Sequence, residues 1–114
     1  MNEKTKSDIS NILFSLGIMP NYRGYQFTLY SVLYALEDPY SLTSVTKCLY
    51  PEVAKMFKTN WESVERNIRT AISQAWKNNK KKLIELSGNT ITEKPKPAHF
   101  IGIIVSYYQK ESIN

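Results

Sequence analysis

The residues with the clearest chemical potential lie in one amphipathic segment, residues 60–78. Its apolar residues follow the three-and-four spacing of a buried helical stripe: Trp61, Val64, Ile68, Ala71, Ile72, Ala75 and Trp76. The other positions are mostly residue types that bond bases or phosphates, such as arginine toward guanine, asparagine toward adenine and glutamate toward cytosine. Arg66 and Arg69 are three residues apart and therefore neighbours on a helix. This face is typical of a helix that enters the major groove of duplex DNA.

The residues alone leave a plainer alternative open, which is an ordinary solvated surface helix. In that case Glu62 with Arg66, and Glu65 with Arg69, form ion pairs at i,i+4 spacing. The charge distribution favours the first interpretation. The net charge is +5, and residues 58–82 hold seven basic and two acidic residues, which account for the whole excess. One basic segment on a neutral body predicts a surface for a polyanion.

Enzymatic chemistry has little support in this sequence. Cys48 is the only cysteine and His99 the only histidine, and they lie in separate predicted helices with no third partner indicated. We expect Cys48 to be a small core residue and His99 a surface or capping residue. There is neither a glycine-rich phosphate loop nor a spacing typical of metal ligands. The sequence therefore predicts a protein that is not an enzyme and has no cofactor or metal.

Length and composition predict a single domain over residues 1–114, without a receiver domain. The chain of 114 residues is 42% hydrophobic, which is enough to build a core without disulfides or metals. Its longest apolar run, at residues 100–105, is too short to span a membrane, and no apolar stretch of the secretory kind follows the N-terminus. We expect a cytoplasmic protein with no membrane partner.

Periodicity and turn residues predict an all-α fold of five to six helices. The expected helices cover about residues 6–16, 22–37, 44–57, 60–78, 80–86 and 97–110, with a loop at 89–96. Pro51 predicts an irregular first half of the third helix, and Pro97 can occupy the first position of the last one. Thr59 with Glu62 predicts a capping box for the fourth helix.

The third and fourth helices are expected to form a helix-turn-helix, because only a short turn at residues 58–60 separates them. The inner face of the third helix is predicted to consist of Leu49, Val53, Ala54, Met56 and Phe57. The seam between the two helices is predicted from Val53, Ala54, Phe57 and Val64. We also expect Trp61 and Trp76 to be largely buried, Trp76 more so.

Eight blocks between about Asp8 and Tyr108 resemble one known family. They are Gly24-Tyr25-Gln26, Glu37-Asp38-Pro39, Ser44-Val45-Thr46-Lys47, Leu49-Tyr50-Pro51, Val64-Glu65-Arg66, Ile68-Arg69, Ala71-Ile72 and Ala75-Trp76. The chain resembles the C-terminal DNA-binding domain of stage zero sporulation protein A, the response regulator that starts endospore formation in Firmicutes. The resemblance implies a six-helix domain that binds a short asymmetric duplex element of the TGNCGAA type.

The resemblance also implies which residues read bases. The family's recognition helix uses an arginine, then a glutamate and an arginine, and a further arginine faces the DNA. Glu65, Arg66 and Arg69 fall on the last three positions, whereas Ser63 stands where the first arginine is expected. A serine is short and uncharged, so we expect Ser63 to lie exposed near the base edges and to read guanine less sharply. The expected base-contacting set is Ser63, Glu65, Arg66, Asn67 and Arg69.

The expected phosphate contacts come from polar and basic residues around the two helices: Ser44, Thr46, Lys47, Lys58, Thr59, Asn60, Thr70 and Lys77. The resemblance implies two further partners, RNA polymerase sigma factor and a second copy bound in tandem on DNA. The chain is expected to be either an excised effector domain or an orphan without phosphorylation control. The alternative function is a protein-interaction module or antagonist acting on the full-length regulator or on sigma factor.

Overall fold

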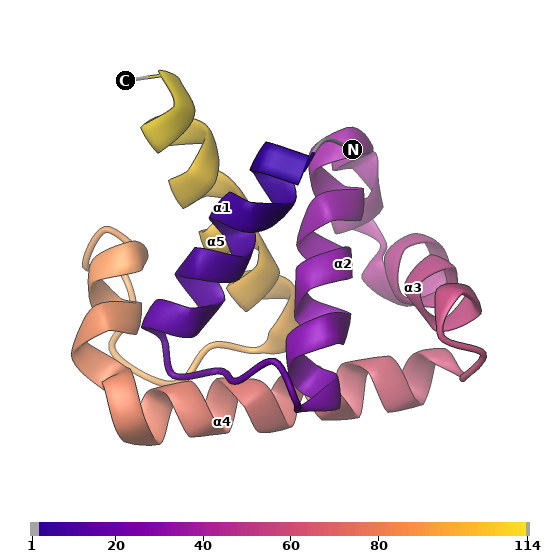
Figure 1. Ribbon diagram of the computed structural model, residues 1–114, viewed down its shortest axis with the longest axis horizontal. Helices are drawn as coiled ribbons and strands as arrows, with labels where there is room; N and C mark the ends of the chain where they lie inside the picture. The colour runs from indigo at the N-terminus through magenta and orange to yellow at the C-terminus, as the bar shows by residue number, and fades with distance from the viewer. Residues whose placement is uncertain (1–2, 114) are drawn as a thin grey trace.

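A computed structural model describes residues 3–113, and every regular element in that range is helical, which confirms the all-α prediction. Figure 1 shows the α-helices, with α4 lying along one side and the other helices stacked against it. The elements are α1 (Glu3–Ser15), α2 (Arg23–Glu37), a 3-10 turn η1 (Pro39–Thr43), a π-helical turn η2 (Val45–Leu49), α3 (Tyr50–Met56), α4 (Trp61–Leu86) and α5 (Pro97–Ile113).

The long element α4 consists of two helical segments separated at Asn79, whose backbone is non-helical at φ −142° and ψ 44°. The two expected helices at 60–78 and 80–86 are therefore confirmed. The Asn79 side-chain amide donates a 3.1 Å hydrogen bond to the carbonyl of Leu16, at the end of α1. Gly17 follows at φ +82°, and a Cβ there would lie 2.6 Å from the same amide nitrogen. The kink thus fits against a tight turn that only glycine accommodates easily.

A single hydrophobic core joins all the helices, and α2 and α4 contribute the largest shares of it. The stripe on α4 is buried as predicted at Val64, Ile68, Ala71, Ile72 and Ala75. Trp61 and Trp76 are partly buried and pack against this core, which agrees with the prediction that most of each side chain is covered. These two residues begin and end the stripe, and the Lys80 ammonium lies 4.9 Å from the ring centre of Trp76.

The third helix is irregular in its first half, as predicted from Pro51. A π-helical turn replaces the α-helix over Val45–Leu49, and Pro51 lies within the first turn of α3. Two burial predictions fail here. Cys48 is exposed because Leu49 next to it faces the core. Met56 is exposed because Phe57 instead fills the seam, with its ring 5.2 Å from that of Phe27.

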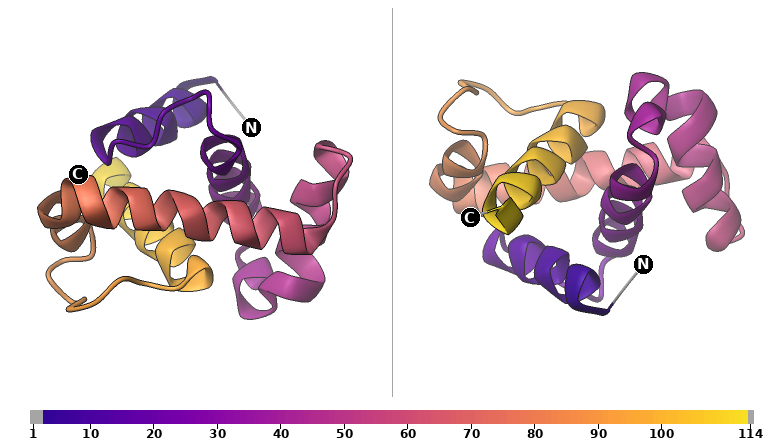
Figure 2. Two further views of the ribbon diagram at one scale, coloured as in Figure 1. Left: turned by 90° about the horizontal axis from the view of Figure 1, so that it is seen from below. Right: turned by 90° about the horizontal axis from the view of Figure 1, so that it is seen from above.

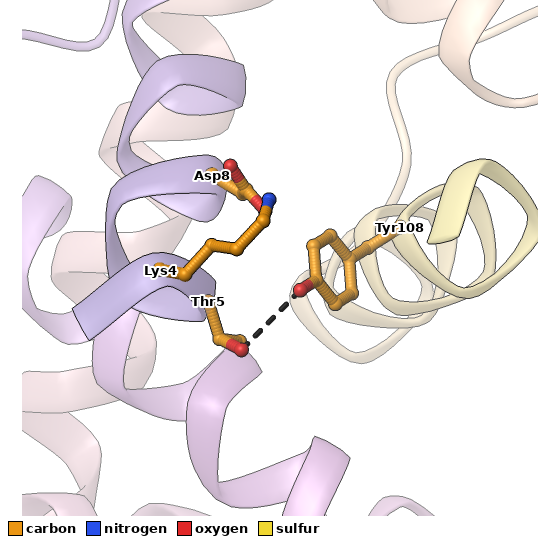
Figure 3. Close-up of polar contacts among 4 residues, drawn as sticks. All are labelled: Lys4, Thr5, Asp8 and Tyr108. Carbon is orange, nitrogen blue, oxygen red and sulfur yellow. Dashed lines mark hydrogen bonds and ion pairs between the residues drawn. The ribbon is translucent and has the colours of Figure 1, made fainter. Parts of the chain in front are cut away.

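The chain ends are tied together far from α4. The Tyr108 hydroxyl of α5 donates to the Thr5 hydroxyl of α1 at 3.3 Å, while Lys4 pairs with Asp8 at 3.1 Å on the same turn of α1 (Figure 3). The outer face of α4 therefore lies on the opposite side of the molecule from these contacts (Figure 1). Among residues 3–113, no helix is both long enough and apolar enough to cross a membrane.

Candidate nucleic-acid interface

The N-terminus of α4 is fixed by Asn60, not by Thr59. Asn60 is extended at φ −112° and ψ 163°, and its side-chain oxygen accepts a 2.8 Å hydrogen bond from the backbone N–H of Ser63. The predicted capping box is wrong because Thr59 is needed to end α3. Its backbone N–H donates to the carbonyl of Ala54 at 3.0 Å, while Lys58 takes a left-handed φ of +53°. The connection between α3 and α4 is thus short and hydrogen-bonded, as a helix-turn-helix requires.

The outer face of α4 is uncovered over its first three turns. Seen from below, α4 runs across the front of the molecule, with the α1–α2 connection on one side and the α4–α5 connection on the other (Figure 2, left). Arg66 and Arg69 are exposed on this face. The predicted pair between Glu65 and Arg69 forms at 3.5 Å, whereas the predicted pair between Glu62 and Arg66 does not form among the described residues. The guanidinium of Arg66 is therefore available, and an exposed pair such as that of Arg69 opens at little cost.

Ser63 and Asn67 lie one turn apart on a different flank of α4, and this flank meets α2 at Asn67. Ser63 is only 6% exposed, so the expectation that it lies exposed at the base edges is wrong. The Asn67 side-chain amide donates to the Ser63 carbonyl at 2.8 Å and lies 3.4 Å from its hydroxyl. The backbone of Asn67 in turn lies against Gly24, where an added Cβ would be 2.5 Å from the Asn67 carbonyl oxygen. The close approach of α2 is what covers this flank.

The residues expected to contact phosphate lie at η2, in the turn between α3 and α4, and on α4. Thr46 and Lys47 are exposed on η2, Lys58 and Asn60 are exposed in the turn, and Thr59 is partly buried there. Ser44 is partly buried at the start of η2. Thr70 and Lys77 are exposed on α4, with the Thr70 hydroxyl donating to the Arg66 carbonyl at 3.1 Å. Polar groups thus precede Arg66 and Arg69 in the chain, at η2 and in the turn, and follow them on α4.

Comparison with known protein families matches residues 9–108 to the family described as sporulation initiation factor Spo0A C terminal. This match covers nearly the whole chain. The chain belongs to this family. It is accordingly a DNA-binding effector domain of a sporulation response regulator, and its role lies in transcription regulation. The Spo0A C-terminal family is a regulatory rather than a catalytic one.

Outside the interface, His99 is exposed in the first turn of α5, which agrees with the prediction of a surface or capping residue. Within residues 3–113 no three side chains of His, Cys, Asp or Glu gather closely enough to hold a metal ion.

A buried tyrosine of α3 lies close to α4 in this domain. Tyr50 is 0% exposed, and its hydroxyl has no hydrogen-bond partner among the described residues. Burial raises the pKa of Tyr50 to about 12; the nearby Glu65 adds to the rise and Arg69 opposes it. The neutral phenol is thus held close to two of the residues expected to read DNA.

We expect the Tyr50 phenol to make the domain less stable in alkali. An unfolded tyrosine ionises near pH 10, while the folded residue holds its proton to about 12. The stability from the neutral phenol is therefore complete below pH 10 and is lost as the pH rises, by about 1 kcal/mol at pH 11. Urea unfolding at pH 7 and pH 11 measures this loss, and Tyr50→Phe should show about 1 kcal/mol less of it. Tyr40→Phe, at a residue that is 83% exposed, is the control. Equal losses in the two variants would contradict the expectation.

One polar contact to α4 escaped the sequence analysis. The Lys94 ammonium, in the loop between α4 and α5, donates to the Ser73 hydroxyl at 3.0 Å across a separation of 21 residues. No local pattern signals such a pair, because neither periodicity nor capping links a loop residue to a helix so distant in sequence. Lys94 extends the positive surface of this Spo0A C-terminal domain beyond the residues predicted.

Proposed function

We propose that the domain binds duplex DNA with the first half of α4 in the major groove, where Glu65, Arg66 and Arg69 contact bases. The observation that carries this proposal is the uncovered outer face of α4, which presents both arginines on a helix that is firmly capped at Asn60. A recognition helix contacts base edges with its N-terminal residues. The guanidinium of an arginine carries donors in a planar fork that fits the O6 and N7 acceptors of guanine, and Arg66 and Arg69 each present one.

The remaining polar residues have two proposed roles. Base contacts by Ser63 and Asn67 stay predictions, and each would require the side chain to leave the contacts with α2 and α4 described above. We propose that the phosphate contacts come from residues at η2, in the turn between α3 and α4, and on α4: Ser44, Thr46, Lys47, Lys58, Thr59, Asn60, Thr70 and Lys77. Phosphate contacts orient the helix, while base contacts select the sequence.

The decisive experiment is selection of bound duplexes from a random pool. The enriched duplex is then titrated with the domain at several salt concentrations. We expect one short asymmetric element to be enriched. Its affinity should fall steeply with salt, because each phosphate contact releases counterions. A pool that stays random, or an affinity insensitive to salt, would contradict the proposal. The latter result would favour the alternative of a protein-interaction module.

We expect weak discrimination at the guanine that the family's first arginine reads. Ser63 is short, uncharged and 6% exposed, so it supplies no bidentate contact there. Substituting that base pair should cost less than about 1 kcal/mol, whereas substitutions opposite Arg66 should cost about 1–3 kcal/mol. Titration of single-base variants of the selected element measures both. If base substitutions at the two positions cost the same binding free energy, a side chain other than Ser63 contacts that guanine.

Family membership also motivates two partner proposals, tandem binding on DNA and contact with RNA polymerase sigma factor. Tandem binding predicts that a duplex with two correctly spaced elements binds two domains more tightly than two isolated elements do. Analytical ultracentrifugation of the domain on duplexes with one and two elements measures this. Contact with sigma factor predicts retention of the purified factor by the immobilised domain at moderate salt.

A further inference from the structure

The loop between α4 and α5 places the ammonium group of Lys94 against the outer face of α4. The Lys94 ammonium is bonded to Ser73, which lies one turn after Arg69 and one turn before Lys77 on the same row of the helix. We infer that Lys94 is a phosphate-contacting residue at the edge of the DNA footprint. This inference rests on the proposed function, since it assumes that the first half of α4 occupies the major groove.

The loop holds Lys94 in place through several local contacts. Asn89 takes a left-handed φ of +62° and donates its backbone N–H to the Ile84 carbonyl at 3.0 Å. Thr90 donates to Ser87 through both its backbone N–H and its hydroxyl, at 3.1 and 2.8 Å. Further along, the loop is anchored because Ile91 and Pro95 are buried. A residue presented from such a fixed loop loses little conformational entropy when it binds a ligand.

The charge of Lys94 is available to an anion. An ammonium group has three donors, and the Ser73 hydroxyl accepts only one of them. Serine is neutral, so the bond leaves the positive charge uncompensated. Among the described residues, Lys94 forms no ion pair with an acidic side chain, and it is exposed. These properties are what a phosphate oxygen requires of a partner.

The position along α4 matches the width of the groove. At 1.5 Å per residue, Ser73 lies about 10 Å along the helix from Arg66. The major groove is about 12 Å wide, so a helix with Arg66 at the base edges meets a phosphate backbone near Ser73. The loop runs beside α4 at this point, on the side away from the α1–α2 connection (Figure 2, left). Lys94 therefore lies where the phosphate backbone at one edge of the major groove would be.

The test is the salt dependence of duplex binding by Lys94→Ala, measured by fluorescence anisotropy on the selected element and on an unrelated duplex. Loss of one phosphate contact should lower the slope of log K against log salt by about 0.9, which is about an eightfold loss of affinity at 0.1 M salt. The loss should be equal on both duplexes, because phosphate contacts carry no sequence information. Lys94→Arg should keep the wild-type slope.

Lys110→Ala is the matched control, because it removes the same charge from an exposed position on the far end of α5. It should change affinity less than twofold, since its charge is screened over that distance. A Lys94→Ala slope equal to that of wild type would overturn the inference, as would a loss no greater than that of Lys110→Ala. A lower melting temperature with an unchanged slope would assign Lys94 to holding the loop alone. Failure of the wild-type domain to bind any duplex would overturn the proposed function as well.

Discussion

Replacing Arg66 and Arg69 together by alanine is expected to weaken binding to the selected duplex by roughly 2–6 kcal/mol, since each bidentate base contact contributes about 1–3 kcal/mol. Both side chains are exposed, and the one interaction they make within the described residues, the Glu65–Arg69 pair, is an exposed one. The fold should therefore stay intact, with a change in unfolding free energy of less than about 0.5 kcal/mol. Titration at fixed salt gives the affinity, and circular dichroism during urea unfolding gives the stability.

The control for this experiment is the double variant Lys4→Ala with Lys110→Ala, which removes the same charge from the far side of the molecule. Lys4 pairs with Asp8 on α1, and Lys110 lies near the end of α5. If the control loses as much affinity as the arginine variant, binding depends on net charge alone. The assignment of α4 as the recognition helix would then be wrong.

Replacing Gly24 by alanine is expected to destabilise the fold by about 1–3 kcal/mol. A Cβ at Gly24 would lie 2.5 Å from the carbonyl oxygen of Asn67 and 2.9 Å from the Cβ of Ala71. Both atoms are fixed to the backbone of α4, so no side-chain rotation can relieve the clash and the helices must separate, at the usual cost of overpacking. Because α4 carries Arg66 and Arg69, the affinity for DNA should fall as well. Urea unfolding and duplex titration measure the two effects.

Gly102 provides the matched glycine control. It lies inside α5, and a Cβ built there meets nothing within 4 Å. Alanine is a better helix former than glycine, so Gly102→Ala should stabilise the domain by up to about 1 kcal/mol. The two alanine variants should therefore shift the free energy of unfolding in opposite directions. A Gly24→Ala variant as stable as wild type, or more stable, would show that α2 and α4 do not approach as closely as described.

Much of the fold could be predicted because its signals are local. Pro97 begins the last helix, the break near Asn79 separates two helical patterns, and Pro51 disrupts the first half of the third helix. Each depends on backbone geometry within a few residues, which a sequence pattern reports directly. The cap of α4 lay one residue away from the prediction, since Thr59 and Asn60 are both good caps and the end of α3 decides between them.

The candidate site was predictable in its residue types and less so in its geometry. The outward face of Arg66 and Arg69 follows from the period of the apolar stripe. The burial of Ser63 does not, because it depends on how the neighbouring helices pack around α4. Nor does the exposure of Cys48, because a π-helical turn changes the direction of side chains relative to an α-helix.

The sequence by itself therefore determined the all-α fold, the amphipathic helix with its basic face and the family to which the chain belongs. Residue types and their spacing along the chain are enough to specify these properties. Only the tertiary structure decided which flank of α4 is covered by α2, and that Lys94 returns to Ser73. The physical reason is that such contacts join residues distant in sequence. Their geometry is set by the packing of whole helices, which no local pattern specifies.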